Sequence, residues 1–104
     1  MKFIIKTNES ILGLGRTLGY KPLGNRNDEY SFARPLGDNY YPRFHIYVRR
    51  EKDALFFNLH LDQKKPSYAG TTAHSGEYDG ELVEIEAERI KGILGRRSQS
   101  LNIF

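Results

Sequence analysis

The sequence predicts a two-layer α+β domain, βαβββα, with two helices on one face of an antiparallel sheet of about four strands. Three stretches alternate apolar and polar residues as strands do, and short polar links join them, which only antiparallel neighbours allow. Helix signals occur near each end of the chain. Because 104 residues suffice for only one core, we expect a single domain over residues 1–95 and a basic, then apolar, tail over 96–104.

The first strand and the first helix are predicted from the N-terminal residues. Residues 2–7 (KFIIKT) are rich in Ile and Phe, as strands are. Asn8 and Ser10 are suitable N-caps for a helix over residues 11–20.

Glycines 13, 15 and 19 in that helix allow two interpretations. Their G-x-G-x-x-x-G spacing resembles a phosphate-binding loop but departs from the dinucleotide-binding fingerprint. We expect instead that Gly15 and Gly19, one helical turn apart, let the helix lie close to the sheet. Residues 21–28 (KPLGNRND) are interpreted as a turn-rich connector.

Strands are predicted over residues 29–36, 43–50 and 55–63. In the last two strands, one set of alternate residues is apolar, while the other set includes His45 and His60. Matching the apolar sets places both histidines on the other face, which we expect to be turned away from the helices.

The hairpin between these two strands has two compatible registers. If residues 51–54 (EKDA) are the whole loop, His45 lies opposite His60. If the loop is only residues 51–52, His45 faces Asn58 and His60 faces Arg43. In either register the two imidazoles lie within about 8 Å of each other, the reach of cross-strand pairs.

The second helix is predicted to begin after Asp79 as N-cap and to end at Gly95. Its core face consists of four apolar residues at helical spacing, Val83, Ala87, Ile90 and Leu94. Glu86 lies inside this apolar stripe, where it is either a buried functional acid or, as we favour, a boundary residue that reaches water.

Two segments of the predicted domain are irregular. Residues 64–80 are too polar and glycine-rich for a strand, and a connection of this length is usually functional. In the tail, we expect Leu101 and Ile103 to form a short terminal strand or to pack under the last helix, because three large apolar residues in water would promote aggregation.

Composition excludes several classes of protein. The chain has no Cys, which excludes disulfides, zinc knuckles and thiol nucleophiles, so a metal would need His and carboxylate ligands. Only three consecutive apolar residues precede Lys6, far fewer than a signal peptide or a membrane span needs. We therefore expect a cytoplasmic protein with no membrane partner.

The charges are unevenly distributed. Residues 77–88 contain six acidic side chains and no basic one, whereas the rest of the chain has sixteen basic and seven acidic side chains. A basic body is typical of proteins that bind phosphate-bearing partners. The alternative is that the acidic run is simply the solvated face of a helix.

The polar sheet face and its rim supply the candidate site. Arg43, His45, Tyr47, Phe56, Asn58, His60 and Asp62 are assigned to the face, and Arg34, Lys64 and Lys65 to the rim. Asp62, two residues from His60 on the same face, can orient that imidazole. The long connection can deliver His74.

Three interpretations of this constellation stay open. The face is a polar surface covered by its own loop, or a non-enzymatic module that binds RNA, single-stranded nucleic acid or another phosphate-bearing ligand, which we favour. The third interpretation is a small metal-dependent or acid–base enzyme, hydrolase-like, that uses His45, His60, His74 and Asp62. No cofactor is indicated, and the catalytic candidates are His45, His60 and Asp62.

Three segments, YPRFHIYV, NLHLDQKKPSY and AHSGEYDGE, resemble those of a small family of uncharacterised bacterial proteins. The resemblance covers roughly residues 15–93. It implies no activity and no cofactor.

Overall fold

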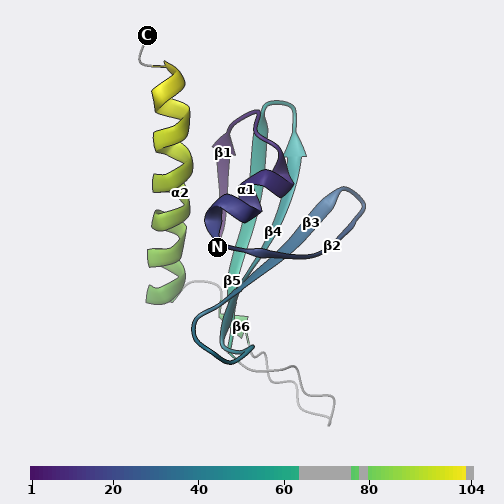
Figure 1. Cartoon of the computed structure of the whole chain (residues 1–104), viewed down its shortest axis with the longest axis vertical. Coiled ribbons are helices and arrows are strands. Elements are labelled where there is room, and N and C mark those ends of the chain that lie inside the picture. The colour runs from purple at the N-terminus through teal and green to yellow at the C-terminus, as the bar shows by residue number, and fades with distance from the viewer. Residues whose placement is uncertain (64–75, 78–79, 103–104) are drawn as a thin grey trace.

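The structure is a computed structural model that describes residues 1–63, 76–77 and 80–102, with side chains for residues 1–63 and 80–95 (Figure 1). Its elements follow the order β1, α1, β2, β3, β4, β5, β6, α2. The strands are β1 (Lys2–Lys6), β2 (Lys21–Arg26), β3 (Glu29–Pro35), β4 (Arg43–Glu51), β5 (Ala54–Asp62) and β6 (Gly76–Glu77). The helices are α1 (Ile11–Leu18) and α2 (Glu81–Asn102).

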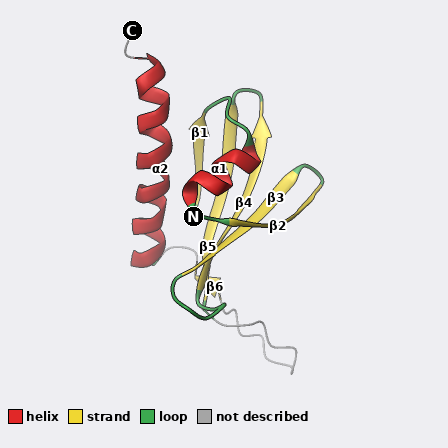
Figure 2. Ribbon diagram, viewed as in Figure 1, coloured by secondary structure: helices red, strands yellow, loops and turns green. Residues whose placement is uncertain are grey.

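The strands form one antiparallel sheet in the order β1-β5-β4-β3-β2, and the two-residue β6 pairs with the end of β5. Both helices contribute to a single hydrophobic core that also contains the apolar residues of β4 and β5. Figure 2 shows α2 beside the β1 edge and α1 crossing the strands. The predicted α+β class is confirmed, although the sheet has more strands than expected.

The helix-covered face is built from the predicted apolar sets. Ile46, Leu55 and Leu59 are almost fully buried. The four apolar residues predicted for the core face of α2 are also buried, namely Val83, Ala87, Ile90 and Leu94. Alternation in the strands and helical spacing in α2 therefore identified the same core from two independent patterns.

Gly15 lets α1 lie close to the sheet, as predicted. A Cβ atom at this position would lie 2.3 Å from Cε2 of Phe32, so only glycine fits. Gly19 has a different role from the one predicted, because it ends α1 in the left-handed conformation, with φ 86°. At the other end, Ser10 is the N-cap, and its side chain accepts a hydrogen bond from the backbone N–H of Gly13.

The interpretation of residues 21–28 as a connector is wrong, because Lys21–Arg26 form β2 and pair with β3. Asn27 and Asp28 turn the chain between the two strands, with φ 53° and 65°. A two-residue hairpin turn needs positive φ at both positions, and Asn and Asp tolerate it well. Pro and Gly are accepted in β2 because it is an edge strand.

Two further boundaries differ from expectation. Helix α2 does not end at Gly95 but continues to Asn102, since a glycine inside a helix costs only about 1 kcal/mol. Gly76–Glu77, in the stretch judged too polar for a strand, form β6. Leu101 lies within α2, so the alternative of a short terminal strand at this residue is wrong. The N-cap prediction for Asp79 and the predicted packing of the Leu101 and Ile103 side chains lie outside the described residues.

Among the described helices, none combines the length and the apolar character needed to cross a membrane.

Candidate functional site on the polar face of the sheet

The polar face is the side of the sheet opposite to the helices. Strand alternation and register place the following residues on it: Glu29, Ser31 and Ala33 of β3, Arg43, His45, Tyr47 and Arg49 of β4, and Phe56, Asn58, His60 and Asp62 of β5. His45 pairs directly with His60, so the first of the two predicted registers is confirmed. Lys52 and Asp53 form the turn between β4 and β5, and the left-handed Lys52 has φ 58°.

Asp62 is the centre of a buried polar cluster that we call the Asp62 cluster, which consists of Ser31, Arg43, His45, His60 and Asp62. One carboxylate oxygen, Oδ2, lies 3.3 Å from Nδ1 of His45 and 3.2 Å from Nε of Arg43. The other, Oδ1, lies 3.0 Å from Nε2 of His60. Asp62 thus holds both imidazoles that the sequence placed on this face.

The contacts determine where His45 carries its hydrogen. An ionised carboxylate can only accept hydrogen bonds, so Nδ1 of His45 is the donor to Asp62. In a neutral ring the other nitrogen, Nε2, is then an acceptor. It lies 2.7 Å from Oγ of Ser31, whose hydroxyl donates to it. The result is a continuous chain from the Ser31 hydroxyl through His45 to Asp62.

Burial keeps both imidazoles neutral at physiological pH. His45 and His60 are only 9% and 7% exposed. Desolvation, reinforced for His45 by the neighbouring His60, lowers the pKa of His45 below its usual value of 6.5. Desolvation also lowers the pKa of His60, and in both residues the attraction of Asp62 opposes the shift only in part.

Arg43 lies on the polar face as predicted, and its charge is already paired there. It is 8% exposed, pairs with Asp62, and its guanidinium lies 4.5 Å and 4.7 Å from the ring centroids of Tyr40 and Tyr41. Burial alone would lower the pKa of Arg43, but the hydrogen bond to Asp62 and the adjacent tyrosines raise it overall. Arg43 is therefore a permanent cation whose position suits it to hold the carboxylate.

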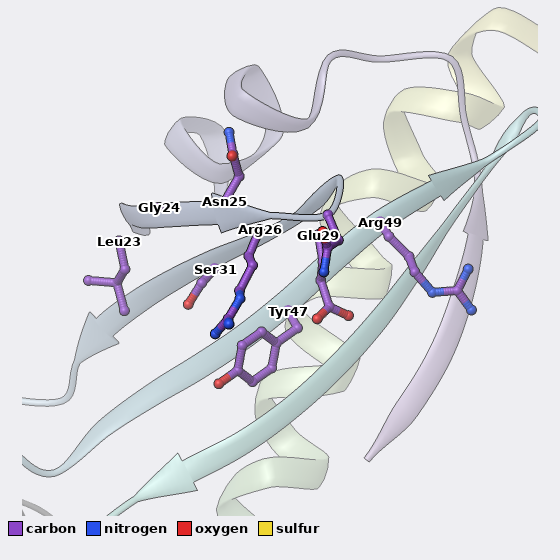
Figure 3. A pocket seen from close by; sticks show the side chains of 9 residues that line it. Leu23, Gly24, Asn25, Arg26, Glu29, Ser31, Tyr47 and Arg49 are labelled. Carbon is purple, nitrogen blue, oxygen red and sulfur yellow. The ribbon is translucent and has the colours of Figure 1, made fainter.

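A hollow on the polar face, which we call the β2–β4 hollow, lies next to the cluster (Figure 3). It is lined by Leu23, Gly24, Asn25, Arg26, Asn27, Glu29, Ser31, Tyr47 and Arg49. In Figure 3 the side chain of Arg26 extends into the hollow toward Tyr47, whereas Arg49 points away from it. Ser31 is the member of the Asp62 cluster that lines this hollow.

A bulge in the edge strand shapes the wall of this hollow. The register of β2 against β3 shifts between Pro22 and Gly24, so Leu23 is an extra residue opposite the pair of Ser31 and Phe32. Gly24, with φ 149° and open space where a Cβ would lie, faces Ser31 across the strands. Bulges commonly occur at sheet edges beside functional sites.

A second hollow lies on the same face toward β1. It is lined by Lys2, Phe3, Ile4, Glu29, Tyr47, Arg49, Phe56, Phe57 and Asn58. Here the guanidinium of Arg49 covers the Phe56 ring, 4.5 Å from its centroid, and also pairs with Glu51. Three predicted binding residues, Tyr47, Phe56 and Asn58, lie at this hollow as expected for the polar face.

Arg34 lies on the opposite face, so its assignment to the rim of the polar face is wrong. Its Nη2 atom lies 2.9 Å from Oε1 of Glu86, which is 2% exposed. The interpretation of Glu86 as a boundary residue that reaches water is also wrong, because Tyr20, Arg34 and Arg89 all donate hydrogen bonds to it.

A divalent metal also fits part of the Asp62 cluster. One ligand atom each from His45, His60 and Asp62 lies within 4.8 Å of the others. Two imidazoles and one carboxylate with open positions form a donor set used by zinc and iron centres. In such a centre Nδ1 of His45 would be a ligand, and Nε2–H would donate to Ser31.

Three predicted site residues, Lys64, Lys65 and His74, lie outside the described residues. Two other residues were missed by the sequence interpretation, Ser31 and Arg26. The predicted strand over residues 29–36 already places Ser31 on the same face as Ala33. Its contact with His45 was missed because the pairing of this strand with its neighbour was not worked out residue by residue. Arg26 was missed because its strand was taken for a connector.

Comparisons of this chain with protein-family models, with curated proteins and with solved structures find no match.

Proposed function

We propose that this protein is a small, metal-independent hydrolase that cleaves an ester carrying an anionic group, with His45 as the general base. One observation carries the proposal. A buried, neutral imidazole is fixed through Nδ1 by Asp62, while its Nε2 atom faces a hydroxyl at the edge of the β2–β4 hollow. A positioned, unprotonated base is what proton abstraction needs.

The surrounding residues support distinct roles. Asp62 orients His45 and stabilises the imidazolium that forms when the base takes a proton. Arg43 neutralises Asp62 and keeps it in place. Arg26, which extends into the hollow, is suited to contact an anionic group of the substrate. The preference for an anionic ester rests on this one cation.

The charges of the Asp62 cluster favour metal-independent chemistry. Nε of Arg43 lies 3.2 Å from Oδ2 of Asp62, so a dication bound by this carboxylate would meet a fixed positive charge close by. Elemental analysis of untagged protein tests this point. Stoichiometric zinc, manganese or iron that disappears in His60→Ala would contradict metal independence.

The test of the proposed function is hydrolysis of two activated esters, p-nitrophenyl acetate and mono-p-nitrophenyl succinate. We expect His45→Gln to reduce kcat/KM for both esters by about 100-fold or more, the usual contribution of a general base. Arg26→Gln should raise KM for the succinate ester alone. Arg16→Gln, an exposed arginine on α1, is the matched control and should leave both rates unchanged.

Two results of this assay would contradict parts of the proposed function. If wild-type protein hydrolyses neither ester faster than His45→Gln does, ester hydrolysis by His45 is ruled out. If only the response to Arg26→Gln is absent, the anionic preference is wrong and the base assignment stands.

A second candidate function is the binding of single-stranded nucleic acid or another phosphate-bearing ligand. The observation that favours it is a pair of half-buried rings, Tyr47 and Phe56, beside Arg49 on the polar face. Rings among cations on a sheet suit base stacking and phosphate contacts. Arg43 is not counted among the phosphate contacts, because Asp62 already pairs with it.

A fluorescence titration with mixed RNA and DNA oligomers at about 50 mM salt tests this candidate. Binding should weaken steeply as salt is raised, and Phe56→Ala should weaken it further. An absence of binding at high micromolar protein would eliminate the nucleic-acid module.

A further inference from the structure

Ser31 is placed next to His45 by strand register alone. Ala33 is the direct partner of His45, and Ser31 is the partner of Tyr47, so Ser31 and His45 are diagonal neighbours on the polar face. Their side chains span this diagonal, with Oγ of Ser31 2.7 Å from Nε2 of His45. That distance is normal for a hydrogen bond between a hydroxyl and an imidazole.

The chain Ser31–His45–Asp62 has the connectivity of a serine nucleophile activated by a base. In such arrangements the hydroxyl donates to Nε2 of the imidazole, and Nδ1–H donates to a carboxylate. Each contact is present here, with the carboxylate 3.3 Å from Nδ1. Such triads are recognised by their geometry, because their order along the chain differs among unrelated folds.

Ser31 is also accessible to a substrate. It is half-buried and lines the β2–β4 hollow, whereas His45 behind it is buried. Arg26 lines the same hollow and supplies a positive charge for the anionic group of the substrate. The bulge at Leu23 and the absence of a side chain at Gly24 leave room opposite the hydroxyl.

We infer that Ser31 is the catalytic nucleophile and forms a covalent acyl-enzyme, an inference that rests on the proposed ester hydrolase. Oγ of Ser31 attacks the ester carbonyl carbon while its proton passes to Nε2 of His45. The bond to the leaving alcohol then breaks, and the alcohol oxygen takes that proton. Water attacks the acyl group next and gives a proton to His45, which returns it to Oγ as the carboxylic acid departs.

A fluorophosphonate probe tests the nucleophile directly, because it forms a stable phosphonyl adduct with an activated serine. We expect one adduct per chain by intact mass, located at Ser31 by peptide mapping. Ser31→Ala should abolish the adduct, His45→Gln should slow its formation at least about 100-fold, and Arg16→Gln should label like wild type.

A second variant, Ser31→Cys, tests the inference even if Ser31→Ala does not fold. Ser31→Cys introduces the only cysteine in the chain. The thiolate is the form that reacts with iodoacetamide, and the neutral base His45 should help to form it. At pH 7 the thiol of Ser31→Cys should therefore react at least about 10-fold faster than the thiol of the double variant Ser31→Cys, His45→Gln. Equal rates would overturn the inference.

The failures are distinguishable. Ester hydrolysis that depends on His45 without an adduct at Ser31 would overturn the nucleophile and leave the hydrolase, with His45 activating water. Absence of both hydrolysis and adduct would overturn the two proposals together.

Discussion

Each face of the sheet holds a carboxylate with several partners, Glu86 buried under the helices and Asp62 half-buried on the polar face. Glu86 is 2% exposed and accepts hydrogen bonds from Tyr20, Arg34 and Arg89. The side chain of Asp62 is 17% exposed, and its partners are one guanidinium and two neutral imidazoles. Glu86 is thus surrounded by groups that always donate hydrogen bonds, while Asp62 contacts two imidazoles that can gain a proton.

This difference separates a structural role from a chemical one. Burial opposes the ionisation of Glu86, but the donated hydrogen bonds lower its pKa overall, and burial raises the pKa of Tyr20. Arg89 also donates to the backbone oxygen of Leu18, so this network joins α2 to α1 and, through Arg34, to β3. Asp62, in contrast, presents His45 to a hydroxyl beside a hollow.

The largest expected effect is on stability, at Glu86. Glu86→Gln removes the counter-charge of two partly buried arginines, and breaking such a pair costs about 3–5 kcal/mol. The melting temperature should therefore fall by more than about 10 °C, because about 1 kcal/mol shifts a domain of this size by about 4–8 °C. Calorimetry or thermal circular dichroism measures it.

Glu88→Gln is the matched control for Glu86→Gln. Glu88 lies two residues along the same helix, is exposed, and forms a long pair with Lys91, 3.8 Å between Oε1 and Nζ. We expect its replacement to change stability by less than about 0.5 kcal/mol. Equal effects of the two substitutions would show that the network under the helices does not hold the fold.

The next effect concerns the close packing of the helix-covered face. Gly15→Ala would place a methyl group 2.3 Å from the Phe32 ring, and overpacking of this kind destabilises by about 1–3 kcal/mol. Gly13→Ala, in the same helix, meets nothing closer than 3.8 Å and should be neutral or stabilising. Urea unfolding of the two variants should give opposite signs.

A smaller loss of stability, about 1–2 kcal/mol, is expected for Asp62→Asn, since the charged hydrogen bonds weaken but the amide can still form some of them. The distinctive effect is on the imidazoles. Because Asp62 partly opposes the downward shifts, its replacement should lower the pKa values of His45 and His60 further. A rise of either value in an NMR titration of the variant would contradict the assigned contacts.

The smallest effect is the pH dependence of stability. In the unfolded chain the two imidazoles bind protons near pH 6.5, whereas in the folded protein they bind them only at lower pH. Between these two pH ranges the unfolded state therefore binds more protons than the folded state. The free energy of unfolding should therefore fall as pH decreases from 7.5 to 5.5. His45→Gln should flatten this slope, measured by urea unfolding at three pH values.

Glu86 affects the free energy of unfolding in a separate, more acidic pH range. Its folded pKa is lowered from 4.5, so its contribution is present above pH 4.5 and is lost as pH falls through the lower folded value. Glu86→Gln should consequently leave the slope between pH 7.5 and 5.5 unchanged.

Patterns of local residues predicted much of this structure, and long-range pairings explain most of what they missed. Alternation in the two central strands predicted that His45 and His60 share a face, because the apolar sets allow only one parity, but it left two registers open, and the structure shows the one that pairs them. Ser31 meets His45 only through the pairing of β3 with β4, which local alternation does not fix. Glu86 was misjudged because three donors compensate its burial, namely Tyr20 between α1 and β2, Arg34 of β3 and Arg89 of α2.

The central claim is that His45 is a neutral base held by Asp62 through Nδ1, and an NMR titration of the imidazole nitrogens of wild-type protein tests it most directly. Assignment uses His45→Gln and His60→Gln. The account predicts midpoints below 6.5 for both residues and, at pH 7, a hydrogen on Nδ1 of His45. A midpoint above 6.5 for His45, or a hydrogen on Nε2 at pH 7, would contradict it.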